Sequence, residues 1–277
     1  GAQKIVKMLE KLKETAEFLG RYADQPIEWA VILGTGLGDL VTEIDVRHRI
    51  PYSQIPHFPI STVEGHSGEM IFGYLGGKYI MALNGRFHYY EGYPMDKVTY
   101  PVRVMKLMGI RRLVVSNAAG GINPAHRIGD IMIINDHINM IPEHPLRGKN
   151  IDELGPRFVD MKDAYNPAMI RRAKEIAAEN GIEVCEGVYL ALQGPTFETQ
   201  AEYLMVSRLG GDAVGMSTVP EVIVARHMGI EVFGVSIITD LGLPGKMANV
   251  SHEEVQAVGR TATPEVMKIV KELIRTL

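Results

Sequence analysis

Apolar residues recur along this chain with two different periods, which predict helices and strands in alternation. Residues 3–20 carry an apolar side chain at every third or fourth position, a helical stripe that ends at Gly20. Short uninterrupted apolar runs are instead typical of strands that are buried on both faces. Such runs occupy residues 29–33, 113–116, 131–134, 187–192 and 230–239. Helical patterns lie between or after them, at residues 97–108, 167–179, 198–209, 219–228 and 252–277.

One segment departs from this alternation and makes the predicted sheet mixed. Residues 69–84 form two β-rich runs joined by Gly76-Gly77, the pattern of a β-hairpin. No linker, internal repeat or low-complexity tract divides the 277 residues. The sequence therefore predicts one α/β domain, residues 1–277, with a mixed central sheet and helices around it. Residues 142–166 are rich in proline, glycine and charge, which indicates a long loop of the kind that often carries function.

Composition and charge exclude several classes of function. The 29 basic and 33 acidic residues give a net charge of −4, unlike a strongly basic nucleic-acid binder. Apolar runs are too short for a membrane span, and the charged residues 3–14 do not resemble a signal peptide. Because Cys185 is the only cysteine, no intramolecular disulfide can form, and a reducing cytoplasm is the expected location. No spacing of His, Cys, Asp or Glu is typical of a metal site, so we expect no bound metal. The net charge and the short apolar runs lead us to expect no nucleic-acid partner and no membrane association.

A glycine-rich corner, Gly34-Thr35-Gly36-Leu37-Gly38, follows the first predicted strand. Small residues there let backbone N–H groups approach an anion, and Thr35 adds a hydroxyl donor. The corner departs from the dinucleotide-binding pattern Gly-x-Gly-x-x-Gly, because its third glycine comes one residue early and position 55 is not acidic. Taken alone, it is either an anion-binding turn or a purely structural one.

A second corner follows the hairpin and contains Arg86 and His88. Two residues apart in an extended segment, these side chains face the same side, and a guanidinium beside an imidazole suits a phosphate. The alternative is a surface arginine with a loosely packed histidine. The position of these two residues directly after a strand favours the phosphate-binding interpretation, since α/β proteins bind ligands at strand ends. His66, between glycines in Gly65-His66-Ser67-Gly68, is either a further phosphate contact or a loop histidine without a role.

Corners after the later predicted strands supply different chemistry. One places the ring of Phe197 beside the carboxylate of Glu198, and another offers the thioether of Met216 and the hydroxyl of Ser217. Asp240 ends the most apolar strand, where a carboxylate is costly unless it caps a helix or has a function. Residues 117–121, Asn-Ala-Ala-Gly-Gly, end another strand with little side-chain bulk. Together the corners supply phosphate donors, a stacking ring and two carboxylates.

These motifs resemble, in their order from about Trp29 to the C-terminal helix, those of the trimeric purine nucleoside phosphorylases. The resemblance rests on residues 34–38, 65–68, 85–92, 117–121, 194–199 and 215–221. It implies a mixed, distorted sheet wrapped by helices, and a homotrimer with sites near the subunit boundaries. It also implies phosphorolysis, in which a purine nucleoside and inorganic phosphate give a free purine and a pentose 1-phosphate. Phosphate is then a co-substrate, and no cofactor is expected.

The resemblance also assigns roles to individual residues. Phosphate would be held by Thr35, Arg86, His88, the Ala118 N–H and Ser217, with His66 nearby. Ribose would contact Tyr90, Met216 and His252, and the base would lie among Phe197, Glu198, Asp240 and Tyr189. The aromatic that such trimers lend to a neighbouring site would be Phe158. The catalytic groups would be His88, Glu198 and Asp240.

Asp240 is where this sequence departs from relatives specific for 6-oxopurines, which usually have Asn. Burial and a nearby Glu198 would both raise the pKa of Asp240. A neutral Asp240 can donate to purine N7 and accept from a 6-amino group. We therefore expect inosine and guanosine as substrates, with adenosine also accepted. The alternatives are a 5′-methylthioadenosine phosphorylase, a non-catalytic nucleoside-binding protein and, more distantly, a nicotinamide-dependent dehydrogenase.

Overall fold

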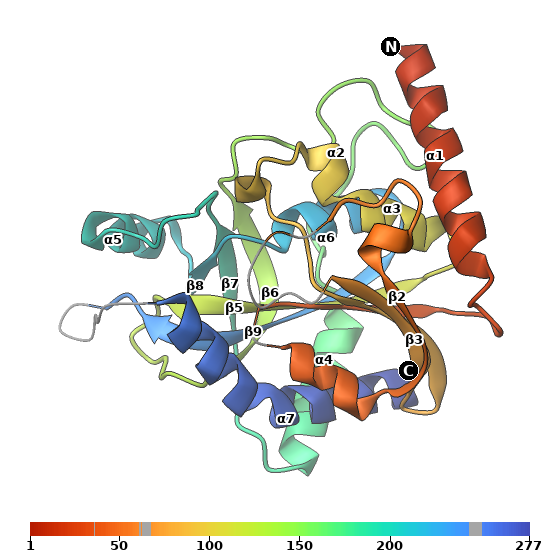
Figure 1. Ribbon diagram of the computed structural model, residues 1–277. Helices are drawn as coiled ribbons and strands as arrows, with labels where there is room; N and C mark the ends of the chain where they lie inside the picture. The colour runs from red at the N-terminus through yellow and green to blue at the C-terminus, as the bar shows by residue number, and fades with distance from the viewer. Residues whose placement is uncertain (36, 61, 63–67, 244–250) are drawn as a thin grey trace.

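The computed structural model describes residues 1–35, 37–60, 62, 68–243 and 251–277. Its strands form one mixed sheet with helices on both faces, which confirms the predicted fold class (Figure 1). The strands are β1 (Trp29–Leu33), β2 (Asp45–Pro51), β3 (Glu69–Leu75), β4 (Lys78–Asn84), β5 (Arg112–Gly121), β6 (Ile131–Asn139), β7 (Cys185–Ala191), β8 (Ala213–Gly215) and β9 (Glu231–Leu241). The helices are α1 (Ala2–Gly20), α2 (Met95–Val98), α3 (Tyr100–Leu107), α4 (Pro167–Glu179), α5 (Gln200–Leu209), α6 (Val219–His227) and α7 (His252–Thr276).

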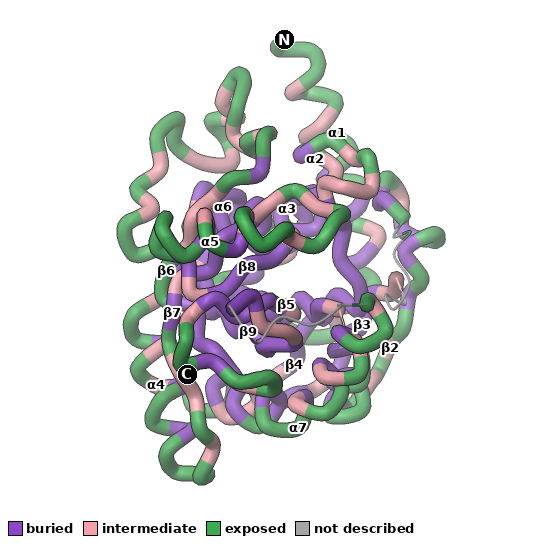
Figure 2. The backbone as a smooth tube through the Cα atoms, turned by 90° about the vertical axis from the view of Figure 1, so that its left-hand side faces the viewer, coloured by how far each residue is buried: buried purple, intermediate pink, exposed green. Residues whose placement is uncertain are grey.

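Strand β1 separates two hydrophobic cores, because its successive side chains point to opposite faces. Trp29, Val31 and Leu33 join a cluster that includes the apolar faces of α4 and α7. Ala30 and Ile32 join the other cluster, which includes residues of α1, α3 and α6. All five residues of β1 are buried, as the uninterrupted apolar run predicted. The strands consequently lie beneath a more exposed layer of helices and loops (Figure 2).

Half of the sheet closes into a ring of five strands. The order runs β2-β3-β4-β1-β5-β8-β7-β6-β9, and β9 then pairs with β5, so that β5, β8, β7, β6 and β9 form a barrel-like ring. The pairs β1–β4, β1–β5 and β5–β9 are parallel, whereas β2–β3–β4, β5–β8 and β6–β9 are antiparallel. The hairpin of β3 and β4 turns at Gly76-Gly77, both with positive φ, as predicted.

The structure departs from the predicted elements in β2 and β8, which the sequence did not predict, and in β5, which is longer than expected. We expected the strand to end at Ser116, but it continues to Gly121 and pairs with β9 and β8. The two glycines serve this ring closure rather than a turn: a Cβ at Gly120 would meet a carboxylate oxygen of Asp240 at 3.1 Å, and one at Gly121 would meet Ile238 at 2.9 Å. The small residues are needed because the strands of the ring approach closely.

The predicted helix at residues 97–108 is two helices, α2 and α3, that meet at Thr99. Pro101, at the start of α3, lacks the N–H that a continuous helix would require. The predicted helix at residues 198–209 begins instead at Gln200. Thr199 is its N-cap, accepting from the Glu202 N–H at 3.1 Å, so Glu198 stays outside the helix in the preceding corner.

Candidate active site

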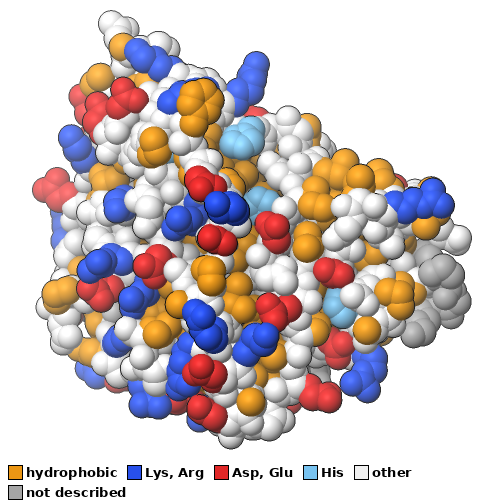
Figure 3. All heavy atoms as spheres, turned by 180° about the vertical axis from the view of Figure 1, so that it is seen from behind, with side chains coloured by type: hydrophobic (Ala, Val, Ile, Leu, Met, Phe, Trp, Pro, Cys, Tyr) orange, Lys and Arg blue, Asp and Glu red, His pale blue; other side chains and the backbone are white. Residues whose placement is uncertain are grey.

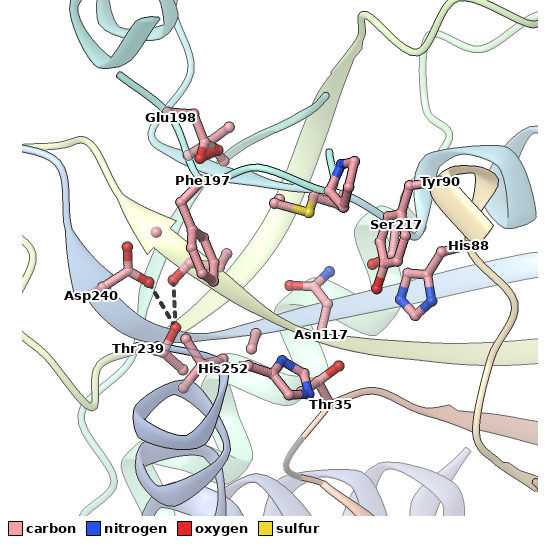
Figure 4. A pocket seen from close by; sticks show the side chains of 18 of the residues that line it. Thr35, His88, Tyr90, Asn117, Phe197, Glu198, Ser217, Thr239, Asp240 and His252 are labelled. Atoms are coloured by element: carbon pink, nitrogen blue, oxygen red, sulfur yellow. Dashed lines mark hydrogen bonds between the residues drawn. The ribbon is translucent and has the colours of Figure 1, made fainter. Parts of the chain in front are cut away.

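A cavity of about 290 Å³ opens where the predicted corners meet (Figure 4). Its walls come from the carboxyl ends of β1, β4, β7, β8 and β9, from the second half of β5, and from the first turn of α7. This is the edge at which α/β sheets bind ligands. The lining residues are Thr35, Arg86, His88, Tyr90, Asn117, Ala118, Ala119, Gly120, Pro195, Phe197, Glu198, Val214, Gly215, Met216, Ser217, Thr239, Asp240, His252 and Val255.

Arg86 is held rigidly at one end of the cavity. Its guanidinium donates to Glu221 Oε1 at 2.7 Å and to the backbone carbonyl of Ser116, and the side chains of Arg86 and Glu221 are 1% and 5% exposed. Glu221 lies in the first turn of α6. Gly34 permits this arrangement, since a Cβ there would come within 2.9 Å of the guanidinium and 2.7 Å of the Ser116 carbonyl oxygen. The cation therefore has a fixed position beside the glycine-rich corner.

His88 lies near Arg86 and is positioned by Glu91. The His88 backbone N–H donates to Glu91 Oε2 at 2.6 Å, and His88 Nδ1 lies 3.2 Å from the same oxygen. The other oxygen, Oε1, accepts from the N–H and the hydroxyl of Thr62, at 2.8 and 2.7 Å. Burial acts to raise the pKa of Glu91, but these hydrogen bonds from His88 and Thr62 outweigh it and lower the pKa to about 2. Burial lowers the pKa of His88, which keeps its ring neutral near pH 7.

Two carboxylates occupy the opposite side of the cavity in Figure 4, with the ring of Phe197 between them. Burial, reinforced by the like charge of Asp240, raises the pKa of Glu198 to about 7. Burial also raises the pKa of Asp240, and the Thr239 hydroxyl, which donates to its Oδ1 at 3.0 Å, opposes that rise. A carboxyl group that changes protonation near neutral pH, as Glu198 does, is typical of a functional site.

Ser217 lies at a strained turn between β8 and α6. Thr218, the next residue, has φ 70° and ψ −52°, and the Val219 N–H donates to the Ser217 carbonyl at 2.7 Å. This is the rarer of the two γ-turn forms, and such backbone strain costs about 1–3 kcal/mol and is concentrated at functional sites. The Ser217 N–H donates to the Tyr189 hydroxyl at 3.2 Å. The turn thereby aims the Ser217 side chain at the cavity.

The cavity brings together most, but not all, of the residues singled out in the sequence. Tyr189 is 0% exposed and does not line it; its hydroxyl instead supports the Ser217 backbone from behind. Phe158 is 89% exposed in the long loop and also lies outside the lining. His66 falls outside the described residues.

Sequence reasoning missed four residues that shape the site. Asn117 and Thr239 line the cavity, while Thr218 and Glu221 hold residues that do. Asn117, Thr218 and Glu221 lie within the motifs at residues 117–121 and 215–221, and Thr239 directly precedes Asp240. None of these local patterns indicated which distant residues the side chains contact.

The described residues outside the cavity were considered for two other classes of function, metal binding and membrane insertion. Basic and acidic side chains are interspersed on the face seen in Figure 3. Among the described residues, no group of three or more His, Cys, Asp or Glu side chains is arranged to hold a metal ion. Within the same part of the chain, no helix is long and apolar enough to span a membrane.

Comparisons with known proteins identify the family of this chain. The Phosphorylase superfamily profile matches residues 28–275. Purine nucleoside phosphorylase 1 of Geobacillus stearothermophilus is 47% identical over 266 residues, 96% of this chain and 97% of that relative. The purine nucleoside phosphorylase of Bos taurus is 46% identical over 275 residues, 97% of this chain and 95% of that one.

Solved structures of Schistosoma mansoni purine nucleoside phosphorylase resemble the fold equally well. The complex with adenosine has a TM-score of 0.91 and 40% identity and covers 97% of both chains. The complex with inosine has a TM-score of 0.91 and 39% identity, over 97% of this chain and 96% of that one. Because the likeness in sequence and in structure extends over nearly the whole chain, the protein belongs to the purine nucleoside phosphorylase family of the phosphorylase superfamily.

Proposed function

We propose that this enzyme cleaves both 6-oxopurine and 6-aminopurine nucleosides with orthophosphate, giving the free base and a pentose 1-phosphate. The observation that carries the proposal is one cavity with a buried arginine and histidine at one end and two carboxyl groups of raised pKa at the other. The first end suits an anion and the second suits the hydrogen-bonding edge of a purine. Relatives of known structure hold adenosine in one case and inosine in another, which supports a broad choice of base.

In this mechanism Arg86, His88, Thr35, the Ala118 N–H and Ser217 hold phosphate beneath the sugar. Cleavage of the N-glycosidic bond develops positive charge on the pentose, much as in glycoside hydrolysis. The bound phosphate is both the counter-charge and the nucleophile. Holding it in place removes an entropic cost of several kcal/mol. Tyr90, Met216 and His252 would position the ribose between the two ends of the cavity.

The purine leaves with negative charge, which a donor at N7 stabilises. Asp240 donates when protonated, and its raised pKa favours that form. A preorganised donor at a developing charge contributes about 3–4 kcal/mol. The second oxygen of Asp240 can accept from a 6-amino group, whereas ionised Glu198 accepts from the N1–H of a 6-oxopurine. Phe197 would stack on the base.

The proposal is tested by following base release from inosine, guanosine, adenosine and 5′-methylthioadenosine, each with and without orthophosphate. We expect phosphate-dependent turnover of the first three, and Asp240→Asn should lose most of the adenosine activity while retaining inosine activity. Adenosine left intact by the unsubstituted enzyme would refute the role of Asp240. A strong preference for 5′-methylthioadenosine over inosine would point to the alternative family member.

We further propose that Phe158 completes the site of a neighbouring subunit in a homotrimer. Its 89% exposure in a long loop away from its own cavity supports this role. Phe158→Ala should then raise the nucleoside KM. Mixing this variant with the inactive Arg86→Met variant should restore sites of normal KM, because the second supplies the ring to the first. Sedimentation showing a monomer at assay concentration, or no recovery on mixing, would contradict the proposal.

A further inference from the structure

Buried hydrogen bonds lead from the middle of β9 to the cavity wall. Ser236 Oγ donates to Asn117 Oδ1 at 2.6 Å, and Asn117 Nδ2 donates to Thr218 Oγ1 at 2.9 Å. Thr218 Oγ1 lies 3.0 Å from Ser217 Oγ, which lines the cavity. Ser236, Asn117 and Thr218 are 0%, 2% and 1% exposed. The hydrogen bonds of these three buried side chains thus lead to the Ser217 hydroxyl, which faces the cavity.

The chemistry of these groups fixes which group donates at each step of this series of hydrogen bonds. An amide nitrogen only donates, so Thr218 Oγ1 accepts from Asn117 and keeps its own proton to donate. Ser217 Oγ is the acceptor that the described residues offer it, and a buried proton without an acceptor is costly. Thr218 therefore donates to Ser217. Ser217 Oγ thus accepts from Thr218, and its own proton remains available for donation into the cavity.

Ser236 fixes this direction from outside the cavity lining. It faces Asn117 in the register of the parallel pair β5–β9, and its proton is satisfied by Asn117 Oδ1. If the amide turned over, its nitrogen would point at Ser236 and its oxygen at Thr218. Thr218 would then donate to the amide, and Ser217 would have to donate to Thr218 instead of into the cavity. The completely buried Ser236 proton would lose its acceptor, which disfavours that arrangement.

We propose that Ser236, Asn117 and Thr218 are positioning residues that hold the Ser217 hydroxyl proton toward a phosphate oxygen. The strained γ-turn at Thr218 belongs to the same device, because it brings the two adjacent hydroxyls within hydrogen-bond distance. The inference rests on the proposed function only in taking phosphate as the anion that Ser217 meets.

The experiment separates positioning from direct contact by using Ser236, which does not line the cavity. Ser236→Ala and Thr218→Val should each raise the KM for orthophosphate about tenfold, with little change in the KM for inosine, because a hydrogen bond to an anion loses its alignment. Thr218→Ser, which keeps the hydroxyl, should restore the KM. Thr15→Val removes a completely buried threonine hydroxyl from α1 and is the matched control, expected to leave the phosphate KM unchanged.

A double-substitution cycle decides whether the effect passes through Ser217. Ser217→Ala should raise the phosphate KM, and adding Thr218→Val to it should cause no further rise, because the two substitutions break one interaction. Additive effects, or Ser236→Ala and Thr218→Val within twofold of the parent enzyme, would overturn the proposal. Calorimetric titration with orthophosphate alone gives the same comparison without any nucleoside, so a failure of the proposed substrate range remains distinguishable from a failure of this inference.

Discussion

Glu198 is expected to choose between purines by its protonation state. Ionised, it accepts from the N1–H of inosine; neutral, it can donate to the unprotonated N1 of adenosine. Since burial and Asp240 raise the pKa of Glu198 to about 7, both forms are populated in the range where the enzyme is easily assayed. Changing the pH around neutrality is therefore the perturbation, and the ratio of the two substrates' kcat/KM values is the quantity to follow.

The size of the effect follows from this pKa. At about pH 6 roughly a tenth of Glu198 is ionised, and at about pH 8 roughly nine-tenths is. The kcat/KM for inosine should rise about tenfold over this interval, while that for adenosine should fall by a similar factor. The inosine-to-adenosine ratio should consequently increase about 100-fold. Titration of phosphate or of His88 affects both substrates and cancels in the ratio, and kcat/KM reports on the free enzyme.

The assay is initial-rate phosphorolysis of both nucleosides across this pH range, at one phosphate concentration. Glu198→Gln, which cannot ionise, should show a flat ratio shifted toward adenosine. Glu202→Gln is the matched control, because that carboxylate caps α5 in the same segment but lies outside the cavity. A parent-enzyme ratio that changes less than threefold, or a Glu198→Gln variant that keeps the full pH dependence, would refute the assignment.

Three further outcomes are expected. Arg86→Met should lower the free energy of unfolding, measured in urea, by about 3–5 kcal/mol, because it leaves Glu221 buried and unpaired. The Arg86→Met/Glu221→Gln double variant should recover most of that loss of stability without recovering activity. Glu91→Gln should lower kcat/KM about tenfold or more by releasing His88, whereas Thr62→Val should lower it much less; equal losses would contradict the role given to His88. The folded-state pKa of Glu198 is raised from 4.5 to about 7, so the native state holds an extra proton between these values and stability falls as the pH rises through them. The Tm of Glu198→Gln should therefore fall less between about pH 5 and pH 8 than the Tm of the parent enzyme. An equal fall in the two Tm values would contradict the raised pKa of Glu198.

The site was predictable to the extent that it depends on strand ends. Arg86, His88 and Glu198 follow buried strands in the sequence, and Asp240 lies at the end of one. The carboxyl ends of such strands meet at one edge of the sheet. We could therefore predict that these side chains share one cavity without knowing which strands are neighbours.

What stayed hidden depends on contacts between segments far apart in the chain. Glu221 and Arg86 are separated by 135 positions, and Ser236 and Asn117 by 119. Neither pair leaves a local pattern. The extension of β5 through Asn117 and Gly121 was also missed, because two glycines after a strand usually indicate a turn, whereas here they allow close packing in the ring.

The closed ring of strands also bears on how copies of the enzyme can associate. Within the described residues the sheet has one unpaired edge, β2, since β9 returns to β5. That edge carries Asp45, Arg47, His48 and Arg49, ends in Pro51 and has an irregular register, all features that discourage pairing with a strand of another molecule. Assembly by sheet extension is thus discouraged at this edge, and subunits that associate are expected to do so through helices and loops.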